Sequence, residues 1–270
     1  MRCSRLIIAA IFAALVSPLP VAGEASIHLR YEAYWGGLYA ADFVLSMGQQ
    51  ANVYENRFHL RTRGLVDLFI KLDVNAESRG QALPEVALSP RHYRVDYANR
   101  WRQRALAIRF NRESGEASTA LLTLKDNDPA EDGPNEPLAL ELRTHVLDPL
   151  VSLSEAIRRL RNHLAGGPKV FRLAVFDGRR RFDVAGAYLG SLKREILRRT
   201  HEVYRLRLTT IPIAGFKSRH RVLWDGSAFD LYLSRDGRFV PLLIVSLGLG
   251  PVINLVCLTS APLGHIEGFA

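Results

Sequence analysis

The sequence is poor in cysteine, with Cys3 and Cys257 as the only two among 270 residues. Cys3 lies in an N-terminal segment with the features of a cleaved leader, so the remaining chain cannot form an internal disulfide. Small secreted domains without a sufficient core depend on disulfides. A chain of this length can instead bury about 70% of its surface. We therefore expect hydrophobic burial to hold the fold, with Cys257 packed as a small core residue.

The sequence also lacks the motifs of common catalytic and cofactor sites. It has no Gly-x-Ser-x-Gly nucleophile elbow, and its eight histidines are scattered without metal-ligand spacing. Gly248 and Gly250 have no third glycine to complete a dinucleotide-binding turn. We therefore predict neither a cofactor nor a metal ion. Carboxylate pairs for acid–base catalysis are brought together by the fold rather than by spacing, so an enzyme remains the third of three hypotheses.

The N-terminus has the order of features found in a secretory signal peptide. Two arginines precede an unbroken apolar run at 6–16, and two prolines and then small residues follow it. The run is shorter than the roughly 20 residues that a transmembrane helix needs. We predict that residues 1–25 are a signal peptide, cleaved after Gly23 or Ala25, and that 26–270 form a single exported domain. The predicted location is the periplasm, with no membrane span after cleavage.

Basic residues outnumber acidic ones, 36 to 27, which gives a formal net charge of +9. An excess of this size favours anionic partners. Nucleic acid is a poor candidate for an exported protein, so we predict no nucleic-acid partner. Anionic lipid headgroups and phosphorylated glycolipids of the cell envelope are the polyanions that such a protein would meet.

Most of the chain after the leader alternates apolar and polar residues with period two, the pattern of half-buried strands. Glycine-containing turns separate these stretches. The alternation covers 27–35, 58–63, 68–77, 93–97, 106–110, 204–208, 220–224 and 229–233. The sequence therefore predicts a mainly β fold of about 10–12 antiparallel strands. So many short strands should curl into a barrel or half-barrel, with apolar faces inside and arginine-bearing faces outside.

One amphipathic helix is predicted at 148–165, where it would cover the opening of the sheet. Asp148 is a suitable N-cap, and a proline follows it at the first helical position. Arg158, Arg159 and Arg161 give the second half of the helix a basic face. This face could contact an anionic surface, or the helix could simply cover the sheet of its own domain.

Two other segments need separate interpretation. The stretch 125–137 is acidic and rich in proline, so we expect a surface loop. Its carboxylates could ligate calcium, but their spacing does not fit the loop that places ligands at alternate positions. The uncharged stretch 240–258 is interrupted by Gly-Leu-Gly-Pro, which favours two short strands over a membrane helix.

Four short segments carry a resemblance to a known family. They are YEAYWGGL at 31–38, LSPRHY at 88–93, DPL at 148–150 and LYLSRDGRFVP at 231–241. In these segments the chain resembles domain-of-unknown-function family 3108, a family of exported bacterial proteins, in which a Trp is commoner than Tyr232. The resemblance implies an exported β-rich domain, and it brings no established activity or catalytic residues.

These observations lead to two leading hypotheses. In the first, the curled sheet is a binding module that encloses a lipid or another amphiphile. In the second, the protein is a structural or accessory envelope protein that acts through protein or anionic-surface contacts. The residues expected to line the cavity are Tyr31, Trp35, Leu72, Tyr97, Leu206 and Leu233, and those expected at the anionic contact are Arg158, Arg159 and Arg161.

Overall fold

The computed structural model describes residues 25–82, 87–126, 138–217, 225–247 and 252–262. The leader predicted at 1–25 (except Ala25), most of the acidic loop predicted at 125–137 and the strand predicted at 220–224 lie outside these ranges. The elements in chain order are β1 (Ala25–Trp35), β2 (Leu38–Gln50), β3 (Val53–Thr62), α1 (Gly64–Phe69), β4 (Asp73–Gln81), β5 (Ser89–Ala98), β6 (Arg102–Phe110), β7 (Ala117–Asp126), η1 (Leu140–Arg143), α2 (Pro149–Leu164), β8 (Val170–Phe176), β9 (Arg181–Ile196), β10 (Arg199–Ala214), β11 (Ala228–Ser234), β12 (Pro241–Leu247) and β13 (Ile253–Pro262).

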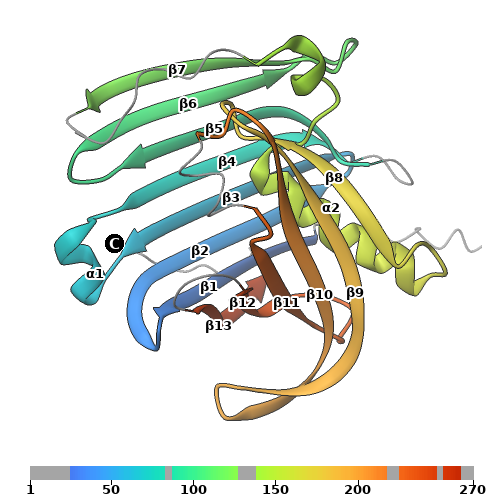
Figure 1. The fold of residues 1–270 in the computed structure, drawn as a ribbon. Coiled ribbons are helices and arrows are strands. Elements are labelled where there is room, and N and C mark those ends of the chain that lie inside the picture. The colour runs from blue at the N-terminus through green and yellow to red at the C-terminus, as the bar shows by residue number, and fades with distance from the viewer. Residues whose placement is uncertain (1–24, 83–86, 127–137, 218–224, 248–251, 263–270) are drawn as a thin grey trace, which may run out of the picture.

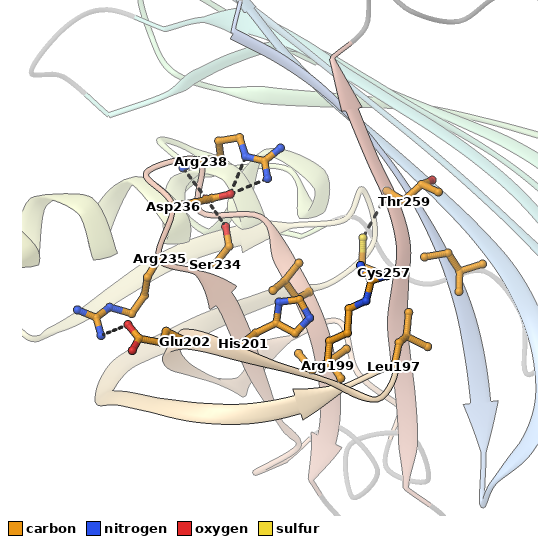
Figure 2. Close-up of a pocket in the computed structure, with 13 residues that line it drawn as sticks. Leu197, Arg199, His201, Glu202, Ser234, Arg235, Asp236, Arg238, Cys257 and Thr259 are labelled. Carbon is orange, nitrogen blue, oxygen red and sulfur yellow. Dashed lines mark hydrogen bonds and ion pairs between the residues drawn. The ribbon is translucent and has the colours of Figure 1, made fainter.

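All of the described strands belong to one antiparallel sheet of thirteen, in the order β7-β6-β5-β4-β3-β2-β1-β13-β12-β11-β10-β9-β8. The first and last strands, β1 and β13, pair in its middle, and β7 and β8 form its edges. Figure 1 shows β2–β7 crossing the molecule while β9 and β10 rise steeply beside them. The predicted mainly β, curled antiparallel sheet is confirmed. It has thirteen strands instead of 10–12, and its edges do not pair with each other.

A connecting segment joins the two edges of the sheet near the start of α2. Thr144 forms a bridge to Glu116 beside β7, and Leu147 forms a bridge to Val175 in β8. The amide of Leu147 donates a 2.8 Å hydrogen bond to the carbonyl before Val175. This extended segment closes part of the opening that the unpaired edges leave, and it leads directly into the helix.

The helix α2 lies on the concave side of the sheet, where it packs against β3, β4, β8 and β9. Its N-cap is Asp148, as predicted, whose carboxylate accepts hydrogen bonds from the amides of Leu150 and Val151. The apolar face of the helix is buried against the inward side chains of β8 to β11. This core cluster contains Ala156, Ile157, Leu160, Leu173, Val175, Phe182, Leu206, Leu231 and Leu233. Among the described residues, no helix combines the length and apolar character needed to cross a bilayer.

The strand predicted through residues 68–77 is wrong in its first part. Residues Gly64–Phe69 form the short helix α1, and β4 begins only at Asp73. Gly64 has a φ of 56°, a left-handed conformation that glycine adopts without a steric penalty, and this turns the chain out of β3. None of the residues of α1 is buried. The alternation there did not mark a buried face.

The position of α2 inside the sheet makes a prediction about stability. Leu160 is 1% exposed, so Leu160→Ala should lower the free energy of unfolding by about 2–5 kcal/mol, because the lost methyl groups leave a cavity. Leu164, one turn further along, is 40% exposed, and Leu164→Ala should cost less than about 1 kcal/mol. Urea unfolding curves measure both. Similar losses for the two variants would contradict this placement of the helix.

Candidate functional site

A pocket of about 800 Å³ lies where the β9–β10 hairpin approaches the β11–β12 turn and β13. These elements are far apart in the sequence. The residues that line the pocket are Ile196, Leu197, Arg199, His201, Glu202, Ser234, Arg235, Asp236, Arg238, Leu242, Cys257, Leu258 and Thr259.

The distal part of the hairpin, residues 190–202, forms one side of the pocket. Gly190 lies where the register between β9 and β10 shifts, and its φ of 111° lets the hairpin bend there. At the tip, Leu197 and Arg198 both have positive φ, the geometry of a two-residue turn that follows the twist of the strands. Ile196 belongs to a buried cluster with Leu243 of β12. This contact holds the tip against the sheet.

The opposite side of the pocket is apolar and comes from Leu242 of β12 and from Cys257 and Leu258 of β13. Cys257 is mostly buried, and its thiol donates a 3.4 Å hydrogen bond to the carbonyl of Thr259. Burial raises the pKa of the Cys257 thiol to about 11. The thiol is therefore neutral at physiological pH, and Cys257 lines the pocket as an apolar residue. Its burial agrees with the prediction that it packs as a small core residue.

Two ion pairs stand at the rim formed by the β11–β12 turn. Arg235 contacts Glu202 at 3.2 Å, and Arg238 contacts Asp236 at 2.6 Å. Burial opposes ionisation of Asp236, but hydrogen bonds from Ser234 and Arg238 outweigh it and lower the pKa of this carboxyl. Both arginines of the turn are therefore partly neutralised within the protein.

Arg199 differs from the other two lining arginines. It is exposed, and among the described residues no carboxylate pairs with it. His201 lies two residues further along the same strand, and both line the pocket from the hairpin side. A guanidinium presents five N–H donors in a planar fork that matches a carboxylate or a phosphate. The pocket therefore combines an apolar wall with a cationic group able to bind an anion.

A second hollow, of about 460 Å³, lies on β2 to β5. Its charged side chains pair with neighbouring carboxylates: Arg57 with Glu55 at 2.6 Å and Arg94 with Asp96 at 2.7 Å. Its cations are thus already engaged, and it suits an anion less well than the larger pocket. In the part of the chain that the structure describes, no cluster of histidine, cysteine or carboxylate side chains could hold a metal ion.

The structure does not bring the six residues predicted to line a cavity together. Tyr31, Leu206 and Leu233 are buried in the core, where the Tyr31 hydroxyl donates a 2.8 Å hydrogen bond to the carbonyl of Pro241. Trp35 is exposed at the end of β1.

The other two lie in the β3–β5 part of the sheet: Leu72 is half-buried just before β4, and Tyr97 is half-buried in β5. None of the six lines the 800 Å³ pocket. The pocket residues carry no local sequence signal, because they meet only when the hairpin bends over distant strands.

The arginines predicted to contact an anionic surface, which are partly buried or exposed, have their guanidinium groups engaged by partners in the protein. Arg158 and Arg159 donate hydrogen bonds of 2.7 and 2.8 Å to Glu155, which is fully buried. Arg161 donates to the carbonyl of Arg238 at 3.2 Å and lies 4.8 Å from the centre of the Phe239 ring. The spacing of Glu155 to the two arginines, three and four residues, is a sequence signal of such helical pairs. Arg161 instead ties α2 to the turn that borders the pocket.

A buried polar network fixes the start of α2 against β3 and β4. One oxygen of Asp148 accepts the helix amides, and the other accepts a 2.7 Å hydrogen bond from Ser78, which in turn lies 3.2 Å from the Tyr54 hydroxyl. Burial raises the pKa of Asp148 to about 6, because removal of the carboxylate from water outweighs these hydrogen bonds. Asp148 is therefore a titratable group inside the core.

The fold and this site define the class of the protein as a β-barrel-like protein with an open sheet, an internal helix and a lateral pocket. The chain belongs to the DUF3108 family, described as a protein of unknown function, whose model matches residues 30–255. The family resemblance found in the sequence is thus confirmed.

The fold is also found among solved structures. One of these is named as a β-barrel-like protein of domain of unknown function DUF1849 from Brucella abortus, and it aligns with a TM-score of 0.52 at 9% identity. The alignment covers 88% of this chain and 97% of that chain. No curated protein matches the chain.

The buried Asp148 predicts a pH-dependent stability difference. Its folded pKa of about 6 lies above the unfolded value of about 3.9, so folding favours the protonated acid. This contribution is complete below pH ~4 and is lost as the pH rises through ~6. Asp148→Asn keeps an oxygen for the helix amides and has no charge to bury. From pH 4 to pH 7 the variant should gain about 2 kcal/mol relative to the wild type in urea unfolding. A difference that does not change with pH would contradict the raised pKa.

Proposed function

We propose that the protein is a binding module for an anionic amphiphile, held in the pocket between the β9–β10 hairpin and β13. The observation that carries this proposal is the pairing of the apolar wall, made by Leu242, Cys257 and Leu258, with Arg199 on the facing side. The volume of about 800 Å³ is in the usual range of ligand pockets, roughly 300–1,000 Å³. An acyl chain would lie along the apolar wall, and its carboxylate or phosphate would bind Arg199.

The proposal includes the compartment. The N-terminal segment predicts export to the periplasm, where the available anionic amphiphiles are fatty acids, phospholipids and glycolipids of the envelope. An accessory role through surface contacts is the second candidate, and its support is a group of exposed apolar side chains around α1.

Palmitate is a suitable first probe, measured by isothermal titration calorimetry and by native mass spectrometry. Arg199→Gln should weaken its binding by roughly tenfold to a hundredfold, because a hydrogen bond to a charged group contributes about 1.5–3 kcal/mol. The matched control is Arg198→Gln, which makes the same charge change at the next residue, outside the pocket lining. Affinity should also rise by up to about fourfold for each methylene added to the acid, as burial of a CH₂ contributes about 0.8 kcal/mol.

Two results would count against the pocket. One is equal weakening by the two arginine variants, which would indicate a general effect of charge. The other is the absence of binding for every chain length tested, both for fatty acids and for lysophosphatidylglycerol.

A further inference from the structure

Large apolar side chains are exposed together at one end of strands β1 to β6, around α1. Leu38, Leu65 and Leu68 are each at least 60% exposed, and Phe69 is 70% exposed. Trp35 and Trp101 are exposed beside them. These six residues are named the apolar rim. Isolated exposed apolar residues are ordinary, whereas a contiguous group of this size marks an interaction surface.

Backbone hydrogen bonds show that the rim is continuous. The amide of Arg63, just before α1, donates a 2.7 Å bond to the carbonyl of Ala40 in β2, next to the turn that carries Leu38. At the other end of α1, the amide of Arg100 donates a 3.3 Å bond to the carbonyl of Ile70, next to Trp101. Figure 1 shows α1 at this end of the sheet, at the left of the view. The β1–β2 turn, the β3–β4 connection that contains α1 and the β5–β6 turn therefore meet in one surface.

No side chain of α1 is part of the hydrophobic core. This helix has six residues and buries none of them, and so short a helix gains too little from its own hydrogen bonds to be stable alone. It is held by its packing on β2 and by the bond between the Thr62 hydroxyl and the Asp67 carboxylate, 2.7 Å long. Leu65, Leu68 and Phe69 are thus presented to the surroundings by a fixed support.

The rim is surrounded by an excess of positive charge. The three segments that form it, 35–42, 61–73 and 98–104, contain six arginine or lysine residues and three aspartates. One aspartate, Asp42, is already paired with Arg63 at 2.7 Å. Lys71 and Arg100 are exposed, and within the described residues no carboxylate pairs with either. Both flank the apolar side chains directly.

We propose that the apolar rim docks the protein onto a phospholipid bilayer that contains anionic lipids. Leucine and phenylalanine side chains on a short amphipathic element enter the boundary between headgroups and acyl chains, and tryptophan is favoured at that depth. Lys71 and Arg100 then face the lipid phosphates. A second copy of the chain fits this surface less well, because a two-fold contact would bring the same cations of both copies together. This docking is independent of the pocket and of its ligand.

The proposal is tested by co-sedimentation of the full chain with vesicles of phosphatidylcholine alone or mixed with phosphatidylglycerol. The wild type should bind the mixed vesicles, more weakly at high salt, and bind phosphatidylcholine vesicles at least several times more weakly. Leu68→Ser with Phe69→Ser, and separately Lys71→Glu with Arg100→Glu, should each weaken binding by about tenfold or more. Tryptophan emission should move to shorter wavelength on binding, by less in Trp35→Phe and Trp101→Phe.

The matched control is Val53→Ser, which removes an exposed apolar side chain (55%) at the opposite end of β3 and should leave binding unchanged. The proposal is overturned if the Leu68/Phe69 variant binds as well as the Val53 control, or if vesicles without anionic lipid bind equally well. Sedimentation velocity adds a third decisive outcome. A wild-type dimer that the Leu68/Phe69 variant converts to a monomer would show that a second copy covers the rim.

Discussion

Two buried carboxylates, Asp148 and Glu155, fix the position of α2 in the curved sheet, and the rest of the molecule depends on that position. A carboxylate without hydrogen-bond partners is very costly in a protein interior. Asp148 finds its partners in the helix amides and in Ser78 of β4, and Glu155 finds them in Arg158, Arg159 and the amide of Leu88. Ser78 and the Leu88 amide lie outside the helix, so a shift of the helix would break these two hydrogen bonds and leave each carboxylate with one partner fewer in the interior.

The helix in turn contacts the elements that form one border of the pocket. Its apolar face supports the inward side chains of β8 to β11. From its last turn, Arg161 reaches the carbonyl of Arg238 and the ring of Phe239, in the β11–β12 turn. That turn supplies the two ion pairs at the border of the pocket. The pocket therefore borders a turn that α2 contacts directly.

Local patterns predicted the regular parts of this structure well. Period-two alternation indicates most strands because one face of each is buried, and Asp148 before a proline marks the start of α2. The pattern failed at Leu68, because neither face of α1 is buried and alternation there carried no information on packing.

The pocket was not predictable for a different reason. Arg199, Asp236 and Leu258 meet only through the bend at Gly190 and the pairing of strands distant in sequence, which no spacing encodes. Likewise, Leu206 and Leu233 read equally well as core or as cavity lining, and the structure places them in the core.

The net charge of +9 does not make the outer surface uniformly basic. Asp230 is almost fully buried between Arg205 and Arg207, and Asp183 forms ion pairs with both Arg172 and Arg181. Burial opposes ionisation of Asp230, but the two guanidinium groups outweigh it and lower the pKa of this carboxyl. Many arginines therefore neutralise buried carboxylates and hold neighbouring strands together, and such pairs attract an external anion weakly.

Selective attraction of an anionic ligand must come from the cations that have no carboxylate partner among the described residues. Arg199 at the pocket and Lys71 and Arg100 at the apolar rim are such cations, each beside exposed or pocket-lining apolar side chains. An amphiphile or an anionic membrane, with charge and hydrocarbon side by side, matches that arrangement better than a simple polyanion does.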